Sequence, residues 1–308
     1  MIGVWLAIAP TFVLIVLGYG LRRGGIPSFE FWNLNDRLVY WVLMPALFFA
    51  KISAADLGAA PVGGFAGILC AGFFAAVAFG WLAQRLARLA PEQGTGVIQG
   101  AGRFNTFVGL AIAEALYGPG GLQAAVLGSA LLVPVVNVVM VTALAGMLGL
   151  GGGSRLGGTL RELVRNPLIL SILLGLGFNA LGLHHVPVLH DTALVLGQGA
   201  LPVMLLCVGA NLRLQGIRPV IGPVILAATG KLVVFPAVTL AAIWLIGPPI
   251  LVAQVAMIYA ALPVAVAAYS LARQMGADAG LMAAMITAQT IAAFITIPLT
   301  LALVPLLY

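Results

Sequence analysis

The sequence predicts an all-α integral membrane protein with ten transmembrane helices. Of its 308 residues, 62% are hydrophobic and only 7% are charged, whereas soluble domains carry roughly 25% charged residues. The alternation of lipid-facing and lumen-facing side chains that is typical of a membrane β-barrel is absent. Because a helical span needs about 20 apolar residues, the apolar sequence accommodates about ten spans. Composition alone therefore excludes a water-soluble fold.

Apolar runs, bounded by charged residues, glycine and proline, mark the expected spans. They cover residues 3–21, 31–50, 62–83, 96–117, 122–148, 164–183, 191–212, 219–246, 250–272 and 281–306. The first run is expected to be a retained span instead of a signal peptide. Arg22 and Arg23 follow this run, whereas a signal peptide begins with its basic residues.

The basic residues predict how the helices are oriented. The loops on one side contain Arg22, Arg23, Arg85, Arg88, Arg155, Arg161, Arg165, Arg213, Arg218 and Arg273. The loops on the other side contain Lys51 alone. Cytoplasmic loops are enriched in basic residues, so we expect both termini on the outer, periplasmic side of an inner membrane. This distribution also accounts for the net charge of +6, and no nucleic-acid partner is expected.

Matching positions at a nearly constant offset indicate an internal repeat. Offsets of 157, 158 and 159 residues separate Pro45 from Pro202, Asn105 from Pro263, and Leu122 from Leu281. They predict two repeats of five spans, over residues 1–150 and 160–308, with chance matching among a few apolar residue types as the alternative. Because five is an odd number, the second repeat must be inverted in the membrane. Inverted repeats are typical of secondary transporters.

Two of the spans are interrupted near their centres. Arg103, Asn105 and Thr106 place a charge, an amide and a hydroxyl within the span 96–117. A charge at the bilayer centre costs at least ~2.5–3.5 kcal/mol, and polar groups there mark solute pathways. At the corresponding position of the second repeat, Pro263 removes a backbone donor. Two interrupted segments in corresponding halves predict a transporter's binding site.

Several short motifs extend along nearly the whole chain. They are Arg103-Phe-Asn-Thr-Phe-Val-Gly-Leu-Ala111 with Ala115-Leu-Tyr-Gly118, Asn166-Pro-Leu-Ile-Leu170, Leu201-Pro-Val-Met-Leu-Leu-Cys-Val-Gly-Ala-Asn211, Ala261-Leu-Pro-Val-Ala265 with Tyr269-Ser-Leu-Ala-Arg273, and Thr287-Ala-Gln-Thr290 with Ile297-Pro298. In their order and spacing they resemble the auxin efflux carrier family, in its bacterial form.

This resemblance implies two inverted five-helix repeats, similar to the bile-acid symporter architecture. Helices 4 and 9 would be broken and would cross at the substrate site. Helices 1, 2, 6 and 7 would form a scaffold, and helices 3–5 and 8–10 a transport domain that moves like an elevator. Scaffold helices in this architecture often meet across a dimer axis, so a homodimer is compatible with it. Bacterial members are mostly associated with small carboxylates such as malate or malonate.

The resemblance also bears on the hinge and crossover positions, which we expect at Gly109, Pro263, Pro45 and Pro202. This chain has Ala111 and Ile112 where a proline often follows the glycine of helix 4. Gly109 can supply backbone flexibility in its place.

The residues at the first interruption suit an anion. The N-terminal end of a broken helix exposes N–H groups that attract negative charge. Asn105 offers two donors and an acceptor, and Thr106 offers a hydroxyl. Arg103 could pair with a carboxylate through two parallel bonds, or its side chain could extend to the cytoplasmic interface. Pro263 either frees carbonyl groups at the crossing or only kinks a packed helix.

Further polar residues are candidates for binding or coupling. Gln289 and Thr290 either face the site or form hydrogen bonds between helices. For Lys231 we favour a structural ion pair with Glu114 or Asp36, over substrate contact or a change of protonation. Asp36 either touches the site or belongs to an ordinary helix start. Glu114 is the one deep carboxylate, which disfavours a multi-carboxylate sodium site and leaves coupling to H⁺ or Na⁺ open.

Other functional classes are not supported. The histidines, His184, His185 and His190, gather in one loop without the spacing of a zinc site. Ser129 and Ser270 therefore lack an in-membrane base, so we expect no enzyme. No nucleotide-binding loop is present, and no metal or cofactor is expected. The sequence thus favours a secondary transporter of small organic anions. The alternatives are sodium-coupled symport of larger amphipathic anions and, more weakly, a channel.

Overall fold

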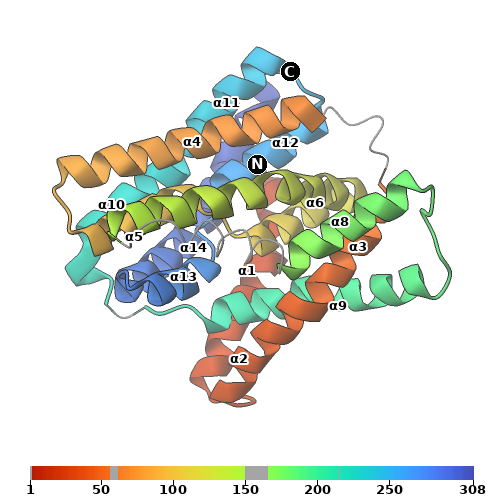
Figure 1. Ribbon diagram of the computed structural model, residues 1–308, viewed down its shortest axis with the longest axis horizontal. Helices are drawn as coiled ribbons and strands as arrows, with labels where there is room; N and C mark the ends of the chain where they lie inside the picture. The colour runs from red at the N-terminus through yellow and green to blue at the C-terminus, as the bar shows by residue number, and fades with distance from the viewer. Residues whose placement is uncertain (1, 56–61, 150–165, 215) are drawn as a thin grey trace.

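The computed structural model describes residues 2–55, 62–149, 166–214 and 216–308, and its regular secondary structure in these ranges is entirely helical (Figure 1). The predicted junction between the two repeats, at residues 150–160, lies outside the described residues, as do Arg155, Arg161 and Arg165.

The first half of the chain consists of four helical stretches, two of them single helices and two built from successive segments. They are α1 (Ile2–Arg23), then α2 (Phe29–Leu38), the π-helical turn η1 (Val39–Leu43) and α3 (Met44–Ser53), then α4 (Val62–Leu86), and finally α5 (Pro91–Gly102) with α6 (Thr106–Met147). Gly118 adopts a left-handed φ of 63° and divides α6 just before Pro119. The predicted fourth and fifth spans therefore follow one another at Gly118 with no intervening loop.

The second half contains more and shorter pieces. They are α8 (Pro167–Ala180), α9 (Leu189–Ala210), η2 (Arg218–Val220), α10 (Ile221–Thr229), the π-helical turn η3 (Gly230–Val234), α11 (Phe235–Ile246), α12 (Ile250–Ala261), α13 (Ala267–Met275), α14 (Ala279–Leu301) and η4 (Val304–Leu306). Pro202 lies inside the continuous helix α9, whereas Pro45 opens α3 directly after the η1 turn.

Six helical stretches of the described residues are long and apolar enough to cross a membrane. Two further apolar helices, α8 and α12, are shorter. Three structural features account for the difference from ten expected spans. The predicted fourth and fifth spans form one stretch, Pro91–Met147, and α8 in place of the sixth is short. The predicted spans 31–50 and 250–272 are each built from short segments joined at a π-helical turn or a break. The chain is an all-α membrane protein in which continuous and interrupted helices are combined.

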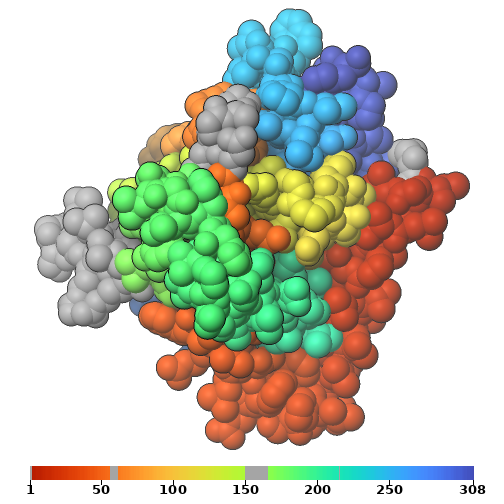
Figure 2. Space-filling view, turned by 90° about the vertical axis from the view of Figure 1, so that its right-hand side faces the viewer, coloured from red at the N-terminus to blue at the C-terminus, as the bar shows by residue number. Residues whose placement is uncertain are grey.

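The helices form two packed groups with α6 between them. One group contains α1, α2, α3, α8 and α9, and the other contains α4, α5 and α10 to α14; α6 contacts members of both. Figure 1 shows α2, α3 and α9 toward the bottom and the right, and α4, α5 and α10 toward the top and the left. Figure 2 shows α8 and α9, in green, on one face beside α6 in yellow.

Close packing of α1 on α9 depends on two glycines. A Cβ atom added at Gly18 would lie 2.0 Å from the backbone oxygen of Leu206, and one added at Gly209 would lie 1.7 Å from that of Ile15. Small residues let helix backbones approach closely where lipid supplies no hydrophobic driving force. The first group of helices is therefore held by backbone-to-backbone contact.

Candidate functional site

The fourth span is broken immediately before its asparagine. Helix α5 ends at Gly102, Arg103 is extended (φ −69°, ψ 150°), and α6 begins at Thr106. The Asn105 side-chain oxygen accepts hydrogen bonds from the backbone N–H groups of Phe107 (3.2 Å) and Val108 (3.3 Å). Asparagine is one of the favoured residues for capping a helix in this way. The break therefore has a local cause in the sequence.

The ninth span is broken at its proline. Helix α12 ends at Ala261, Leu262 is extended (φ −62°, ψ 147°), and α13 begins only at Ala267. A proline disfavours helical geometry in the residue before it and provides no N–H for the helix. Pro263 thus explains where α12 stops.

The two breaks are hydrogen-bonded to each other. The backbone N–H of Asn105 donates to the carbonyl oxygen of Pro263 at 2.8 Å. Gln289, from α14, adds a second connection: its Nε2 donates to the Gly100 carbonyl (2.9 Å), and its Oε1 accepts from the Val264 N–H (2.9 Å). Backbone groups that lost their helical partners at the breaks are paired through these contacts.

A cavity of about 350 Å³, here called the central cavity, lies beside the breaks. Its polar lining includes Asp36, Arg103, Asn105, Thr106, Asn137 and Ser270. The beginnings of α6 and α13 both contribute to its wall. Helix N-termini carry partial positive charge and present N–H groups, so their presence favours negatively charged ligands.

Two of the lining side chains have donors without a hydrogen-bond partner among the described residues. Arg103 is only 9% exposed; its Nη2 donates to the Asn137 side-chain oxygen at 2.8 Å, and its buried Nη1 has no partner. Asn105 is 1% exposed, and its Nδ2 is also buried without a partner. Buried polar groups are rarely left unpaired. The guanidinium lies in the cavity wall instead of extending to the interface.

Sequence analysis missed Asn137 and Ser270 at this cavity. Asn137 is a lone amide inside the apolar run Val135-Val-Asn-Val-Val139, so the polar-residue criterion applied to Asn105 would have found it. Ser270 was considered only as a nucleophile. Asp36, expected either at the site or at a helix start, lines the cavity, and its Oδ2 accepts from Asn211 at 2.9 Å.

Other candidates lie near the crossing without lining the cavity. Pro263, Gln289 and Thr290 are absent from its wall. Thr290 donates to the Ile286 carbonyl of its own helix at 2.7 Å, as hydroxyls in helices commonly do. The break that we expected at Gly109 lies earlier, because Asn105 caps a helix that includes Gly109. A Cβ at Gly109 would lie 2.7 Å from Leu262 Cδ1, so this glycine serves close packing.

The predicted ion pair of Lys231 is wrong. Lys231 is fully buried, and its Nζ donates to the Tyr259 carbonyl at 3.3 Å. It also lies 3.9 Å from the ring centroid of Phe235 and 5.5 Å from that of Phe104. Within the described ranges no carboxylate pairs with it; Glu114 is exposed on α6. A carbonyl at the end of α12 and two aromatic faces surround the ammonium instead.

The histidine loop connects α8–α9 to the end of α3. His190 Nε2 lies 2.8 Å from the Ser53 hydroxyl, and His184 Nδ1 lies 3.1 Å from the Ser53 carbonyl. His185 pairs with Asp191 at 3.0 Å. These contacts give the three side chains structural roles.

A helical membrane protein in which two broken helices meet beside a polar cavity has the features of a membrane transporter. A family model described as "Membrane transport protein" matches residues 4–151 and 154–301. The chain belongs to this family, the auxin efflux carrier family of membrane transporters, and is a transporter and not an enzyme. Comparison with curated protein sequences finds no match.

Proposed function

We propose that the protein is a secondary transporter of small organic anions of the malate or malonate type, which bind at the crossing of the two broken helices. The observation that supports this best is the pair of unpaired donors, Asn105 Nδ2 and Arg103 Nη1, buried beside the central cavity. A carboxylate accepts hydrogen bonds from such donors without supplying any that would need a partner.

The electrostatics of the cavity support an anion of limited size. Among the described residues that line it, Arg37 and Arg103 carry positive charge and Asp36 alone is a carboxylate. The N-termini of α6 and α13 add partial positive charge. A hydrogen bond to a charged group contributes about 1.5–3 kcal/mol. The volume of about 350 Å³ is at the lower end of the range for ligand pockets, about 300–1,000 Å³, which favours a small ligand.

The arrangement of the helices supports alternating access of the elevator type. In this proposal α1, α2, α3, α8 and α9 form the scaffold, and α4 to α6 with α10 to α14 form the moving domain. The central cavity takes lining residues from both groups, such as Asp36 and Met204 on one side and Asn105 and Ser270 on the other. The hydrogen bonds between the two breaks would keep the site intact while the domain moves.

Asn105→Asp tests the proposal without removing the helix cap. An aspartate retains the oxygen that accepts from Phe107 and Val108, but it replaces the Nδ2 donor by a second acceptor. Losing one charge-assisted hydrogen bond should reduce uptake of labelled malonate into liposomes at least tenfold. Because the cap is preserved, the variant should still fold, and its unfolding temperature is measured alongside uptake.

Asn33→Asp is the matched control, because Asn33 is exposed on α2 and the same exchange there should leave uptake unchanged. Equal uptake by Asn105→Asp and wild type would refute a carboxylate site at the crossing. Liposomes should be tested with and without gradients of sodium and of pH. The symporter alternative would be favoured if the liposomes took up a larger amphipathic anion only in the presence of sodium and took up no dicarboxylate.

A further inference from the structure

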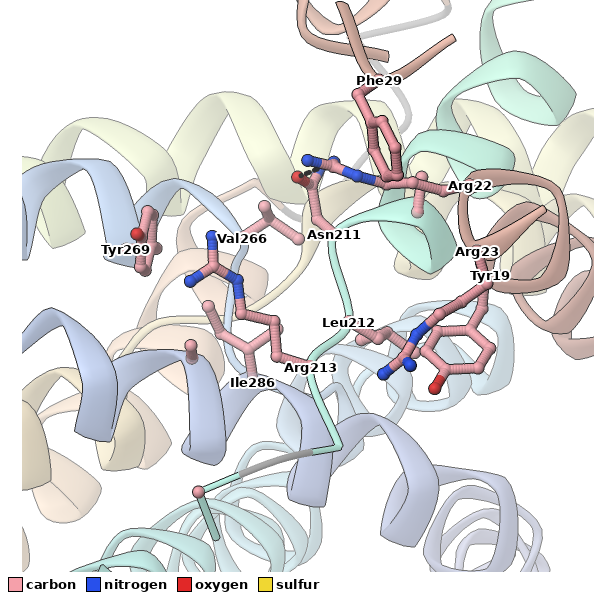
Figure 3. Close-up of a pocket in the computed structure, with 13 residues that line it drawn as sticks. Tyr19, Arg22, Arg23, Phe29, Asn211, Leu212, Arg213, Val266, Tyr269 and Ile286 are labelled. Atoms are coloured by element: carbon pink, nitrogen blue, oxygen red, sulfur yellow. Dashed lines mark hydrogen bonds between the residues drawn. The ribbon is translucent and has the colours of Figure 1, made fainter. Parts of the chain in front are cut away.

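A second and larger cavity lies apart from the crossing. This arginine cavity, as we call it, has a volume of about 460 Å³ and is lined by Tyr19, Arg22, Arg23, Asn211, Arg213 and Tyr269, among others. Figure 3 shows these side chains coming from α1, from the end of α9 and from α13. Of the residues that line the central cavity, it shares Val266 alone. It is on the side that the distribution of basic residues predicts to be cytoplasmic.

The positive charge of the arginine cavity is offset only in part, by the Asp36 carboxylate acting on Arg22. Its lining includes three arginines, and none of the described residues that line it is an aspartate or a glutamate. In the part of the chain that the structure describes, none of the three guanidinium groups forms an ion pair. Asp36 is two hydrogen bonds away from Arg22: Arg22 donates to Asn211 Oδ1 (3.2 Å), and Asn211 Nδ2 donates to Asp36 Oδ2 (2.9 Å).

Neutral side chains position the guanidinium groups. Arg213 lies over the ring of Tyr269 and Arg23 over the ring of Tyr19, each with its Cζ 5.2 Å from the ring centroid. A guanidinium that lies over an aromatic face keeps its in-plane N–H groups available, because those donors point along the plane. Arg22 is oriented by its hydrogen bond to Asn211. Guanidinium groups from α1 and from the segment that follows α9 therefore line one cavity (Figure 3).

We propose that the arginine cavity binds a polyanionic phosphate group, at a site separate from the crossing. A phosphate oxygen pair matches the planar fork of a guanidinium, and a phosphate that carries two negative charges is attracted more strongly by three clustered cations than a monoanion is. The volume is within the range of ligand pockets. The phosphate could belong to a lipid headgroup at the cytoplasmic leaflet or to a soluble metabolite, since both present the same oxygens.

The test uses the full-length protein in a detergent without charged headgroups. Binding is measured calorimetrically for inorganic pyrophosphate, for short-chain phosphatidic acid, and for phosphatidylcholine of the same chain length. Arg213→Gln should weaken binding of a phosphate probe at least tenfold, as expected for a lost charge-assisted contact. Arg273→Gln is the matched control, because Arg273 is exposed on α13 and does not line the cavity.

Binding of phosphatidic acid alone would assign the site to lipid, and binding of pyrophosphate would show that soluble anions reach it; both support the proposal. Equal affinity of wild type and Arg213→Gln, or a failure of both phosphate probes to bind, would overturn it. If Arg213→Gln fails to fold, Arg23→Gln provides the same comparison. Of the interactions described above, this exchange removes only the contact of Arg23 with the Tyr19 ring. Asn105→Asp should bind pyrophosphate or phosphatidic acid like wild type, which separates this site from the proposed substrate site.

Discussion

Gln289→Ala should be among the most damaging single changes near the crossing, although Gln289 does not line the central cavity. Its amide connects α14 to both breaks, through the Gly100 carbonyl and the Val264 N–H. Neither backbone group is shown with another hydrogen-bond partner in the described structure. The substitution leaves both groups unpaired in a fully buried position, where Gln289 is 0% exposed.

The expected loss can be worked out from these two contacts. An unsatisfied buried donor or acceptor costs about 1–3 kcal/mol, so the pair predicts a loss of roughly 2–6 kcal/mol. Hydrogen bonds between membrane helices average only about 0.6 kcal/mol, because partners are found in the unfolded state as well. For Gln289→Ala we expect the estimate of roughly 2–6 kcal/mol to hold, because backbone groups at a helix break have no alternative hydrogen-bond partner within their own helix. Uptake should fall together with stability.

The measurement is unfolding of the reconstituted protein by a denaturing detergent, with Thr290→Val as the control. Thr290 donates only to a carbonyl of its own helix, so this exchange should cost less than about 1 kcal/mol. If Gln289→Ala and Thr290→Val have the same stability, the bridging argument is wrong.

Two other substitutions test the packing. Gly209→Ala should destabilise the protein by about 1–3 kcal/mol or more, because its Cβ would lie 1.7 Å from the Ile15 oxygen. Gly199→Ala is the control: a Cβ there would have no atom within 4 Å, so this variant should be neutral or slightly stabilising in the same unfolding assay. Equal effects of the two exchanges would contradict the close approach of α1 and α9. Lys231→Met should change the unfolding free energy by less than about 1.5 kcal/mol, as in volume-conserving core exchanges. A loss of about 3–5 kcal/mol is expected when one partner of a buried ion pair is removed. Such a loss would show that Lys231 has a carboxylate partner and would contradict the structure.

Residues were easiest to interpret from sequence where their effect is local. Asn105 caps the helix that begins beside it, and Pro263 ends a helix at its own position, so both breaks have causes visible in the chain. Lys231 was misinterpreted because charge alone suggested a carboxylate partner. The groups that surround it, the Tyr259 carbonyl and the Phe235 ring, become its neighbours only when α11 and α12 pack together.

Composition is enough to assign the class of protein, because 62% hydrophobic and 7% charged residues require a lipid environment. The order of the short motifs indicates the family that the family model shows. Composition and motif order can be read from each stretch of sequence and do not depend on how the helices pack. The polar pairings, such as Arg103 with Asn137 and Gln289 with both breaks, arise only when the helices pack together. A buried donor pairs with whichever acceptor faces it. In this protein the facing surfaces are set by helix contacts such as that of Gly209 with Ile15, which no single segment encodes.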